Sequence, residues 1–262
     1  MRAMSIAATG MLAQQTNVEV IANNLANMNT TAYKMQRAEF QDLLYQNIER
    51  PGSASADTGA VLPAGIQIGV GVRTAATYRI TGQGNISTTG NPYDLAVSGK
   101  GYFHIQMPDG TDAYTRDGAF TLSPDGQLVT SKGYVVSPGI SIPQDALSVT
   151  VNSVGQVQVM VAGQSAPQTL GQLELARFPN EGGLQAMGEN LFTETAGSGS
   201  VLTGLPGSPG FGTLQQGYLE TSNVNAVQEI TDLITAQRAY EMNSKVIQAA
   251  DDMASVVSKN IR

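Results

Sequence analysis

The amino-acid sequence predicts an α+β protein, with helices at its two ends and a central, mostly antiparallel β-domain. Three observations predict this class. Apolar residues recur every three or four positions near the N-terminus, the same spacing returns near the C-terminus, and apolar and polar residues alternate in between. We expect residues 1–34 and 220–262 to form one discontinuous, coiled-coil-like helical domain, and residues 75–210 an outer β-domain. Residues 35–74, with about 211–219, are expected to link them as an extended segment or β-hairpin.

The N-terminal helix is predicted from one apolar seam with alternating spacings of three and four residues. The seam indicates a helix from about Met4 to Ala26. An Asn- and Thr-rich stretch follows at residues 23–31, and these residue types favour caps and turns over helix. The residues expected to pack along the seam are Met4, Ala7, Met11, Val18, Ile21 and Leu25, interrupted by Gln14.

The C-terminal helix is predicted to be longer, because neither Pro nor Gly occurs after Tyr218. Asn225, followed three residues later by Gln228, has the pattern of a capping box at its start. The residues expected to pack along its main stripe are Leu233, Tyr240, Ile247, Ala250, Ala254 and Val257. The stripe is widened by Met242, Val246, Met253 and Val256.

A polar row follows the same helical spacing on the opposite side of the predicted C-terminal helix. Its members are Arg238, Glu241, Lys245, Gln248, Asp252, Ser255 and Lys259. The wide apolar stripe offers more surface than one partner helix covers, which favours packing of the chain ends against neighbouring copies. The alternative is an intramolecular helical hairpin that caps the β-domain.

The middle of the chain has the pattern of β-structure. Alternation of apolar and polar residues predicts strands at residues 66–72, 147–151 and 157–161. Asp-Gly pairs recur at residues 109–110, 117–118 and 125–126. Because Asp-Gly suits turns that need positive φ, each pair predicts a β-hairpin.

The one histidine of the chain, His104, lies in a predicted strand. It shares a strand face with Tyr102 and Gln106, opposite Phe103 and Ile105. We expect His104 to face solvent and to have no catalytic role.

The composition excludes several classes of function. The chain has 14 basic and 21 acidic side chains, a net charge of −7, which disfavours binding to nucleic-acid phosphates. It has no Cys and one His, which excludes disulfides, thiolate metal sites and two-histidine sites. Phosphate-loop, dinucleotide and EF-hand patterns are absent, so we expect no enzyme, no cofactor and no metal site. No apolar run of ~20 residues predicts a membrane span.

Two stretches rich in Gly, Ser and Pro, residues 50–65 and 196–212, have the composition of connectors. A flexible linker is the simplest interpretation of both. The first runs directly into the predicted strand at Ile66, which makes it a candidate for an ordered extension.

Three stretches resemble signatures of the rod and hook proteins, the axial family of the bacterial flagellum. They are Ala22–Asn27 with Thr31–Lys34, Gly90–Val97 with Gly99–Phe103, and Gly217–Lys245. Ala32 and Tyr33 stand where the family usually has Gly and Phe, so the turn after the first helix is expected to differ. The signature positions include Asn23, Asn24, Leu25, Asn27, Asn223, Arg238 and Tyr240.

Within this family, the length of the chain and residues 39–71 are most similar to distal rod subunits. The resemblance implies that copies stack into a hollow helical tube, with the C-terminal helices nearest the channel and the β-domains outside. Such a tube would cross the periplasm and outer-membrane rings, transmit torque to the hook and serve as an export channel. The implied partners are further copies of the chain, proximal rod proteins, the hook protein, the ring (bushing) proteins and the flagellar type III export apparatus. Neither nucleic-acid binding nor membrane insertion is implied.

The resemblance also implies roles for two sets of residues. A channel-facing row would comprise Arg238, Glu241, Lys245, Gln248, Asp252 and Lys259, whose mixed charges would avoid trapping an unfolded passenger. A segment that stiffens the rod through contacts between subunits would include Pro51, Gly52, Pro63, Gly65, Ile66 and Ile68. Subunits would be exported unfolded, without a cleavable signal peptide, as the poor signal-peptide pattern at the N-terminus suggests.

Three other interpretations stay open at this point. The chain could be another axial protein of the proximal rod or hook type. It could be a secreted tube or adhesin outside the flagellum, although an adhesin should carry a signal or anchor. A peptidoglycan-cutting enzyme would need a carboxylate pair in a cleft, and no such pair stands out in the sequence.

Overall fold

The computed structural model describes residues 2–48, 65–163 and 166–260. Pro51, Gly52 and Pro63, which we assigned to a stiffening segment, lie outside the described residues. The chain divides into two compact units. The helical unit comprises residues 1–26, 36–79 and 225–262, and the β-unit comprises residues 27–35 and 80–224. Residues 36–79, which the sequence placed in a separate linking segment, group with the helices.

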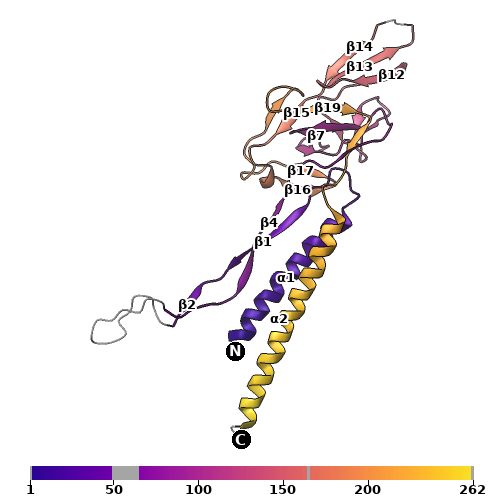
Figure 1. Ribbon diagram of the computed structural model, residues 1–262. Coiled ribbons are helices and arrows are strands. Elements are labelled where there is room, and N and C mark those ends of the chain that lie inside the picture. The colour runs from indigo at the N-terminus through magenta and orange to yellow at the C-terminus, as the bar shows by residue number, and fades with distance from the viewer. Residues whose placement is uncertain (1, 49–64, 164–165, 261–262) are drawn as a thin grey trace. The chain divides into compact units, whose positions relative to one another are not determined.

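The helical unit combines two helices with a long β-hairpin. Its elements are α1 (Arg2–Ala26), β1 (Gln36–Asp42), β2 (Tyr45–Asn47), β3 (Gln67–Gly69), β4 (Val72–Arg79) and α2 (Ala226–Asn260). The two helices lie side by side and antiparallel, with α1 between α2 and the hairpin (Figure 1). Both predicted helices are confirmed. Their three-four apolar spacing is a local property of the sequence and does not depend on which element packs against the helix.

The start of α2 is fixed by a side-chain cap. The Asn225 Oδ1 atom accepts hydrogen bonds from the backbone N–H groups of Val227 at 3.1 Å and Gln228 at 3.3 Å. These contacts satisfy two of the donors that a helix leaves unpaired at its start. The Gln228 side chain bonds to Asp232 instead of reaching back, so only half of the predicted capping box forms.

The β1–β4 part of the hairpin runs along α1 and forms hydrogen bonds with α1 side chains at both of its ends. β1 pairs antiparallel with β4 from Gln36↔Arg79 to Asp42↔Val72. Near Gln36, the Asn24 side chain of α1 bonds to the strand, and near Val72 the Thr9 hydroxyl accepts from the Val72 N–H at 3.3 Å. β2 and β3 continue the hairpin beyond this section.

The β-unit is built from short antiparallel strands. They are β5 (Ile86–Thr88), β6 (Leu95–Ser98), β7 (Tyr102–Gln106), β8 (Asp112–Thr115), β9 (Thr121–Leu122), β10 (Leu128–Val129), β11 (Val135–Val136), β12 (Ala146–Val151), β13 (Gln156–Val161), β14 (Gln168–Gln172), β15 (Leu175–Arg177), β16 (Gln185–Gly188), β17 (Leu191–Thr193), β18 (Leu202–Gly204), β19 (Thr213–Gln216) and β20 (Tyr218–Glu220). A short 3-10 helix, η1 (Glu181–Gly183), precedes β16.

The largest sheet of the β-unit is centred on β7, which pairs with β8, β11 and β15. The predicted strands at 147–151 and 157–161 are confirmed as β12 and β13, with β14 as the third member of their sheet. The main core draws on both sheets and on the later strand β19. Its fully buried members include Phe103, Ile105, Phe120, Val157, Val159, Leu173 and Leu175.

Two of the three Asp-Gly pairs form the predicted hairpins. Gly110 joins β7 to β8 and Gly126 joins β9 to β10, and both have positive φ. The prediction for the pair at 117–118 is wrong. Gly118 does not have positive φ, and a Cβ atom there would lie 1.7 Å from the Leu95 carbonyl oxygen. Gly118 is therefore suited to a close backbone approach, not to a turn.

The prediction that His104 lies on a solvent-facing strand face is correct at Gln106, wrong at Tyr102 and only partly correct at His104. Tyr102, on the same face of β7, is buried in a second core cluster with Tyr114 and Phe178. The His104 ring stacks on Tyr114 with a centroid separation of 5.5 Å, and its side chain is only 24% exposed. The face of β7 that carries Tyr102 and His104 is thus partly covered, while Gln106 at its end stays exposed, and alternation with polar residues does not reveal this partial burial.

Candidate assembly site

The residues predicted to pack along α1 and α2 are buried to different extents in the single chain. Of the predicted α1 residues, Ala7 and Ile21 are buried, and Met4, Met11, Val18 and Leu25 are half-buried. On α2, Leu233, Ile247, Ala250 and Ala254 are half-buried, and Tyr240 stays 44% exposed. The side chain of Val257 lies outside the described residues. The seam predictions missed three buried residues of α1, Ala13, Val20 and Asn24.

The antiparallel register leaves the end of α2 without a partner helix among the described residues. Asn24 bonds to Glu229, and Gly10 lies against Asn243 in the same register. Because the helices are antiparallel, Arg2, eight residues before Gly10, lies opposite Asp251, eight residues after Asn243. The last turns of α2 therefore extend beyond the start of α1, as Figure 1 shows.

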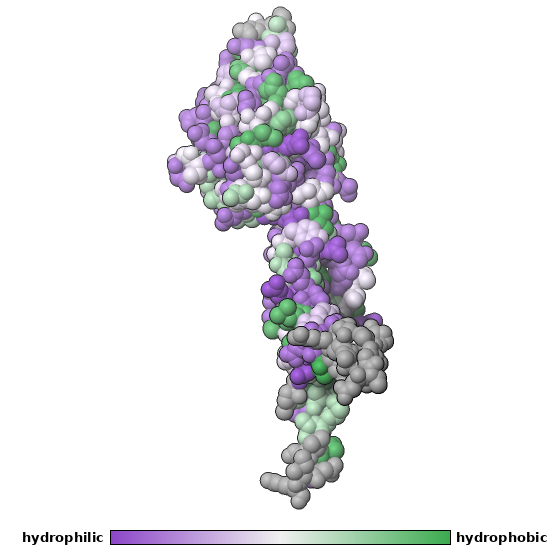
Figure 2. Space-filling view, turned by 90° about the vertical axis from the view of Figure 1, so that its left-hand side faces the viewer, coloured by the Kyte–Doolittle hydropathy of each residue, from purple (hydrophilic) through white to green (hydrophobic). Residues whose placement is uncertain are grey.

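The residues that widen the predicted stripe of α2 are exposed. Met242 is 61% exposed, Val246 47%, Met253 64% and Val256 56%. Near the start of α2, Val227, Ile230 and Ile234 are also exposed. We call Met242, Val246, Met253 and Val256 the apolar flank of α2. Figure 2 shows hydrophobic side chains interspersed with hydrophilic ones on the visible face of this unit.

Every residue of the predicted polar row of α2 is exposed. This holds for Arg238, Glu241, Lys245, Gln248, Asp252, Ser255 and Lys259. The row thus leaves positive, negative and neutral side chains free to face a water-filled space.

The outer part of the β-hairpin exposes a second set of large apolar side chains. Leu44 is 86% exposed, Tyr45 55% and Ile48 55%, and on the facing strand segment Ile66 is 49% and Ile68 38% exposed. Gly65, the remaining described member of the predicted stiffening segment, is half-buried. An isolated two-stranded ribbon with this much exposed apolar surface is only marginally stable in water.

Asn24, a signature residue, joins three elements of the helical unit. Its Nδ2 atom donates to the Gln36 carbonyl oxygen at 2.8 Å and to Glu229 Oε2 at 3.1 Å, and its Oδ1 atom accepts from the Gln36 N–H at 2.8 Å. Burial raises the pKa of the Glu229 carboxyl, and the nearby Asp232 adds to this, although the Asn24 hydrogen bond opposes it. Asn24 therefore fixes the end of α1 against β1 and α2.

A buried charge cluster, Lys34, Arg116 and Glu220, lies inside the β-unit. The Lys34 Nζ atom lies 2.6 Å from Glu220 Oε1, and Arg116 Nε lies 2.7 Å from Glu220 Oε2. All three side chains are at most 7% exposed. Burial alone would raise the pKa of Glu220, but the Arg116 charge and the Lys34 hydrogen bond outweigh it and hold the pKa below 4.5. Burial lowers the pKa of Lys34 below 10.5.

Backbone groups complete the charge cluster. Arg116 donates to the carbonyl oxygens of Gly101 at 2.7 Å and Val97 at 3.3 Å, and also bonds to that of Gly99. The Gly82 carbonyl oxygen accepts from Lys34, and the Gly84 N–H donates to Glu220. No local pattern in the sequence marks Arg116 and Glu220 as partners. The one available clue was that Lys34 and Glu220 each lie inside a signature stretch.

The remaining signature residues differ in their surroundings. Asn223 accepts from the Met35 N–H at 2.7 Å and donates to the carbonyl oxygens of Ile80 and Gly82. Asn27 Oδ1 accepts from the Thr30 hydroxyl at 3.1 Å. Asn23 and Arg238 are exposed.

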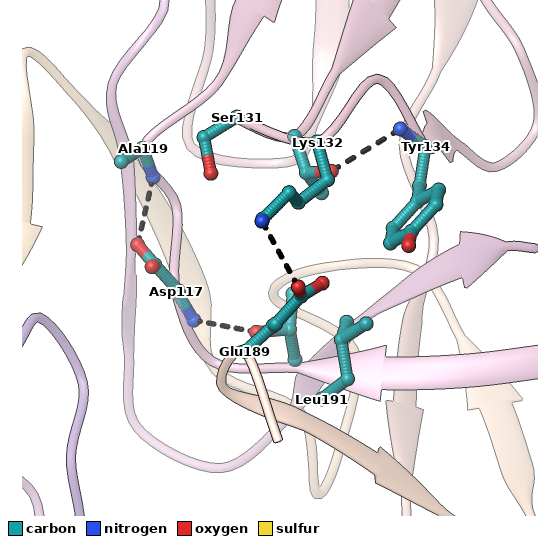
Figure 3. A pocket seen from close by; sticks show the side chains of 9 residues that line it. Asp117, Ala119, Ser131, Lys132, Tyr134, Glu189 and Leu191 are labelled. Carbon is teal, nitrogen blue, oxygen red and sulfur yellow. Dashed lines mark hydrogen bonds and ion pairs between the residues drawn. The ribbon is translucent and has the colours of Figure 1, made fainter. Parts of the chain in front are cut away.

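A small polar pocket lies on the β-unit, lined by residues of several loops (Figure 3). The Lys132 Nζ atom lies 3.1 Å from Glu189 Oε1 across it. Asp117 accepts from the Ala119 N–H, and the Thr130 hydroxyl accepts from the Tyr134 N–H. The polar groups that Figure 3 joins by dashed lines therefore hold neighbouring loops together through hydrogen bonds and an ion pair.

Two other kinds of site are absent from the described residues. No helix in residues 2–48, 65–163 and 166–260 is long and apolar enough to cross a membrane. In the same ranges, no group of three or more His, Cys, Asp or Glu side chains is placed to hold a metal ion.

Comparison with known proteins gives matches along most of the chain. Residues 4–34 match the flagella basal body rod protein family, residues 96–159 the D1 domain of the flagellar hook proteins FlgE/F/G, and residues 215–260 the C-terminal region of the flagellar basal body rod FlgEFG proteins. These ranges contain the three stretches that carried the resemblance or adjoin them.

Full-length relatives are closely similar. The flagellar basal-body rod protein FlgG of Caulobacter vibrioides is 58% identical over 259 residues, covering 99% of each chain. FlgG of Agrobacterium fabrum is 54% identical over 262 residues, covering 100% of each chain. The flagellar hook-basal body complex protein FlhP of Bacillus subtilis is 30% identical over 98% of each chain. This chain therefore belongs to the FlgG family of flagellar basal-body rod proteins.

Proposed function

We propose that this chain is the subunit of a rigid, hollow distal rod that assembles through its terminal helices. The apolar flank of α2 carries this proposal. Met242, Val246, Met253 and Val256 are 47–64% exposed on one side of a helix whose other side already packs on α1. Burying a side chain of this size stabilises an interface by ~1.5–3 kcal/mol. A second copy of the chain is the occupant that a self-assembling rod supplies.

The register of α1 and α2 adds a second argument for assembly. The turns of α2 after Asp251 have no α1 residue beside them in this chain, yet they continue the apolar flank through Met253 and Val256. Isolated helical turns are marginal in water, because helix stability in proteins depends on packing of an apolar face. Neighbouring copies would supply that packing.

Charge substitutions on two sides of α2 test the assembly interface. Val246→Lys places a charge in the apolar flank, whereas Gln248→Lys places the same charge in the polar row. We expect Val246→Lys to weaken tube formation at least tenfold, measured as the protein concentration needed for sedimentable tubes that electron microscopy identifies. Gln248→Lys should assemble as the unsubstituted chain does.

Circular dichroism of both variants at low concentration separates assembly from folding. Because both positions are solvent-exposed within one chain, the helix content of the two variants should match. Equal assembly of Val246→Lys and Gln248→Lys would remove the apolar flank from the interface.

The outer part of the hairpin is the proposed rod-stiffening segment. Leu44, Tyr45, Ile48, Ile66 and Ile68 stay exposed in the single chain, so packing against a neighbouring subunit would bury them. Contacts of this kind between neighbouring subunits would oppose the sliding of subunits that bending of a tube requires. The proposed role is stiffness of the tube, not tube formation.

A double substitution tests the stiffening role. Leu44→Ser, just before β2, with Ile68→Ser on β3 removes apolar surface from both sides of the hairpin, and Gln46→Ser on β2 is the matched control. Tubes of the double variant should form at the normal concentration but bend visibly in electron micrographs, whereas control tubes stay straight. Straight tubes from the double variant would refute the stiffening role.

The polar row of α2 is the proposed lining of the channel. Its alternating charges and amides would give an unfolded passenger of either sign no continuous binding surface. The double variant Lys245→Glu with Lys259→Glu makes the row strongly acidic. We expect it to slow export of later subunits while leaving tube assembly intact, and unchanged export would argue against the assignment.

The proposed partners follow from a position between motor and hook. They are the proximal rod proteins, the hook protein, the periplasmic and outer-membrane ring proteins and the flagellar type III export apparatus. The support for this position is membership of the FlgG family. We place the subunit in the rod where it passes through the periplasm and the outer-membrane rings.

A further inference from the structure

We propose that the β-unit folds only when the C-terminal segment Thr213–Val224 has joined it, with the Lys34–Arg116–Glu220 charge cluster acting as the latch. The inference concerns how one chain folds and stands whether or not the proposed assembly is correct. It assigns to Glu220 a conformational role: the β-unit is held open until this carboxylate arrives.

The charge cluster brings together three distant parts of the chain. Lys34 follows the turn after α1, Arg116 lies after β8 in the middle of the β-unit, and Glu220 ends β20, close to the start of α2. Glu220 is separated from Arg116 by 104 residues and from Lys34 by 186. Closure therefore requires a contact of very long sequence separation, whose entropic cost must be met before its interactions form.

The charges of Lys34 and Arg116 make their burial depend on the Glu220 carboxylate. Without Glu220, the Lys34 and Arg116 cations would share a buried site in which their hydrogen-bond partners among the described residues are the carbonyl oxygens of Gly82, Gly101, Val97 and Gly99. Glu181 attracts Lys34 electrostatically but forms no ion pair with it. Two buried like charges without a counter-ion are strongly unfavourable in a medium of low dielectric constant. The site around Lys34 and Arg116 should therefore stay open to water until the Glu220 carboxylate enters.

The C-terminal segment also completes the sheets and the core. β19 pairs with β6 over four residues, and β20 pairs with β5 over three. Leu214 of β19 is 3% exposed and belongs to the main core cluster. Removal of the segment would thus open the edges of β5 and β6 and a buried position in the core, besides the charge cluster.

Backbone contacts tie the same segment to the N-terminal part of the β-unit. The Ala32 N–H donates to the Glu220 carbonyl oxygen at 2.8 Å, and the Asn223 N–H donates to the Tyr33 carbonyl oxygen at 3.3 Å. Asn223 additionally accepts from the Met35 N–H. The two ends of the β-unit therefore hold each other, so neither is expected to stay folded alone.

Native-state amide hydrogen exchange of the full chain tests the inference without any substitution. If the segment is required for folding, the slowest amides of β19 and β20 should open with the same free energy as those of β7 and β8. Opening of β19 and β20 at least tenfold more often than β7 and β8 would overturn the proposal, because the β-unit would then persist without its last strands.

Glu220→Gln tests the latch itself, since glutamine keeps the shape but removes the charge. Loss of one partner of a buried pair is severely destabilising, so exchange at β7, β8, β19 and β20 should accelerate together, by about 100-fold or more. Acceleration confined to residues 213–224 would overturn the proposal.

A second substitution separates charge from packing. In the double variant Lys34→Met with Glu220→Gln, one buried cation leaves with the anion, and exchange should slow again relative to Glu220→Gln alone. Glu189→Gln is the matched control, because Glu189 pairs with Lys132 on the surface at 45% exposure. The control should change exchange by less than about fivefold. Strictly additive losses in the double variant would refute the latch.

Discussion

The two units of the chain bury different kinds of residue. The β-unit has a core of large side chains, including Phe103, Phe120 and Phe178, and a buried charge cluster whose charges are paired. The most buried apolar residues of the two helices include Ala7, Ala13 and Ala236, while large side chains such as Met242 and Met253 stay exposed. The β-unit thus has a core of large side chains, although Leu147 and Met187 are exposed on its surface, whereas the helical unit leaves much of the apolar surface of α2 exposed within one chain.

This difference fits the sequence properties of each unit. Short strands with alternating residues bury one face against another sheet of the same chain, as β7 and β13 do. A long helix with a wide apolar stripe needs partners on more than one side, and α1 covers only one side of α2. The following predictions test how sharp the difference is, beginning with the largest expected effect.

A truncation in each unit should give very different losses of stability. Ile105→Ala removes a fully buried side chain from the β-unit and should cost about 2–5 kcal/mol in the free energy of unfolding. Val246→Ala, on the apolar flank of α2, should cost less than about 0.5 kcal/mol in the unassembled chain. Urea unfolding, followed by circular dichroism at low protein concentration, measures both. Similar losses would contradict the comparison.

The junction at Asn24 is an exception inside the helical unit, because it is buried and polar. Asn24→Ala should cost about 1–3 kcal/mol, since it leaves the Gln36 backbone groups and Glu229 without their partner. Asn17→Ala, at a half-exposed position of α1, is the control and should be neutral or slightly stabilising through helix propensity. Hydrogen exchange of the β1 amides reports the effect, and equal exchange in both variants would contradict it.

The two buried glutamates should give the units opposite responses to acid. The pKa of Glu229 is raised above 4.5, so the folded helical unit binds the proton more readily and gains stability as the pH falls toward 4.5. The pKa of Glu220 is held below 4.5, so its contribution to the β-unit is present above pH 4.5 and is lost as the pH falls through the folded-state pKa.

Exchange rates of the two units as a function of pH, corrected for intrinsic chemistry, measure this contrast. Glu229→Gln should abolish the gain of the helical unit and leave the acid response of the β-unit unchanged. If the helical unit of Glu229→Gln still becomes more stable as the pH falls, another titrating group causes the response.

The smallest predicted effect concerns the turn between β16 and β17. Glu189 and Asn190 have φ values of +54° and +60°, and Glu is poorly suited to this left-handed conformation. Glu189→Asn should stabilise the β-unit by about 0.5 kcal/mol, because Asn tolerates the turn and the surface pair with Lys132 contributes little. Thermal unfolding checks the sign, and a lower melting temperature would mean that the ion pair outweighs the strain.

The sequence predicts the helices well because their pattern is local. Asn225 caps α2 and the apolar spacing continues without Pro or Gly, so neither feature depends on the rest of the fold. The strands β12 and β13 are likewise visible as alternation. The resemblance to the axial family was correct, since its motifs lie in the same local stretches.

Features that depend on distant partners could not be predicted. The partial burial of His104 is not visible in the sequence, because the second cluster beside it comes from β8, β15 and the loop after it. Gly118 was assigned to a hairpin because the nearby Leu95 carbonyl oxygen is not visible in the sequence. Arg116 has no local pattern, since its partner Glu220 is 104 residues away. The assignments of residues to subunit packing, channel and stiffening segment remain predictions.

Gly10 shows how little room the helix pair allows. A Cβ atom there would lie 2.9 Å from Asn243 Nδ2, so a methyl group would require the Asn243 side-chain amide to shift. In a helical polymer a small change in one subunit is not averaged away; it recurs at every position and accumulates along the lattice. A fraction of an ångström at Gly10 would then change pitch or diameter over the whole shaft. The regularity of the rod's dimensions would thus depend in part on one glycine in α1.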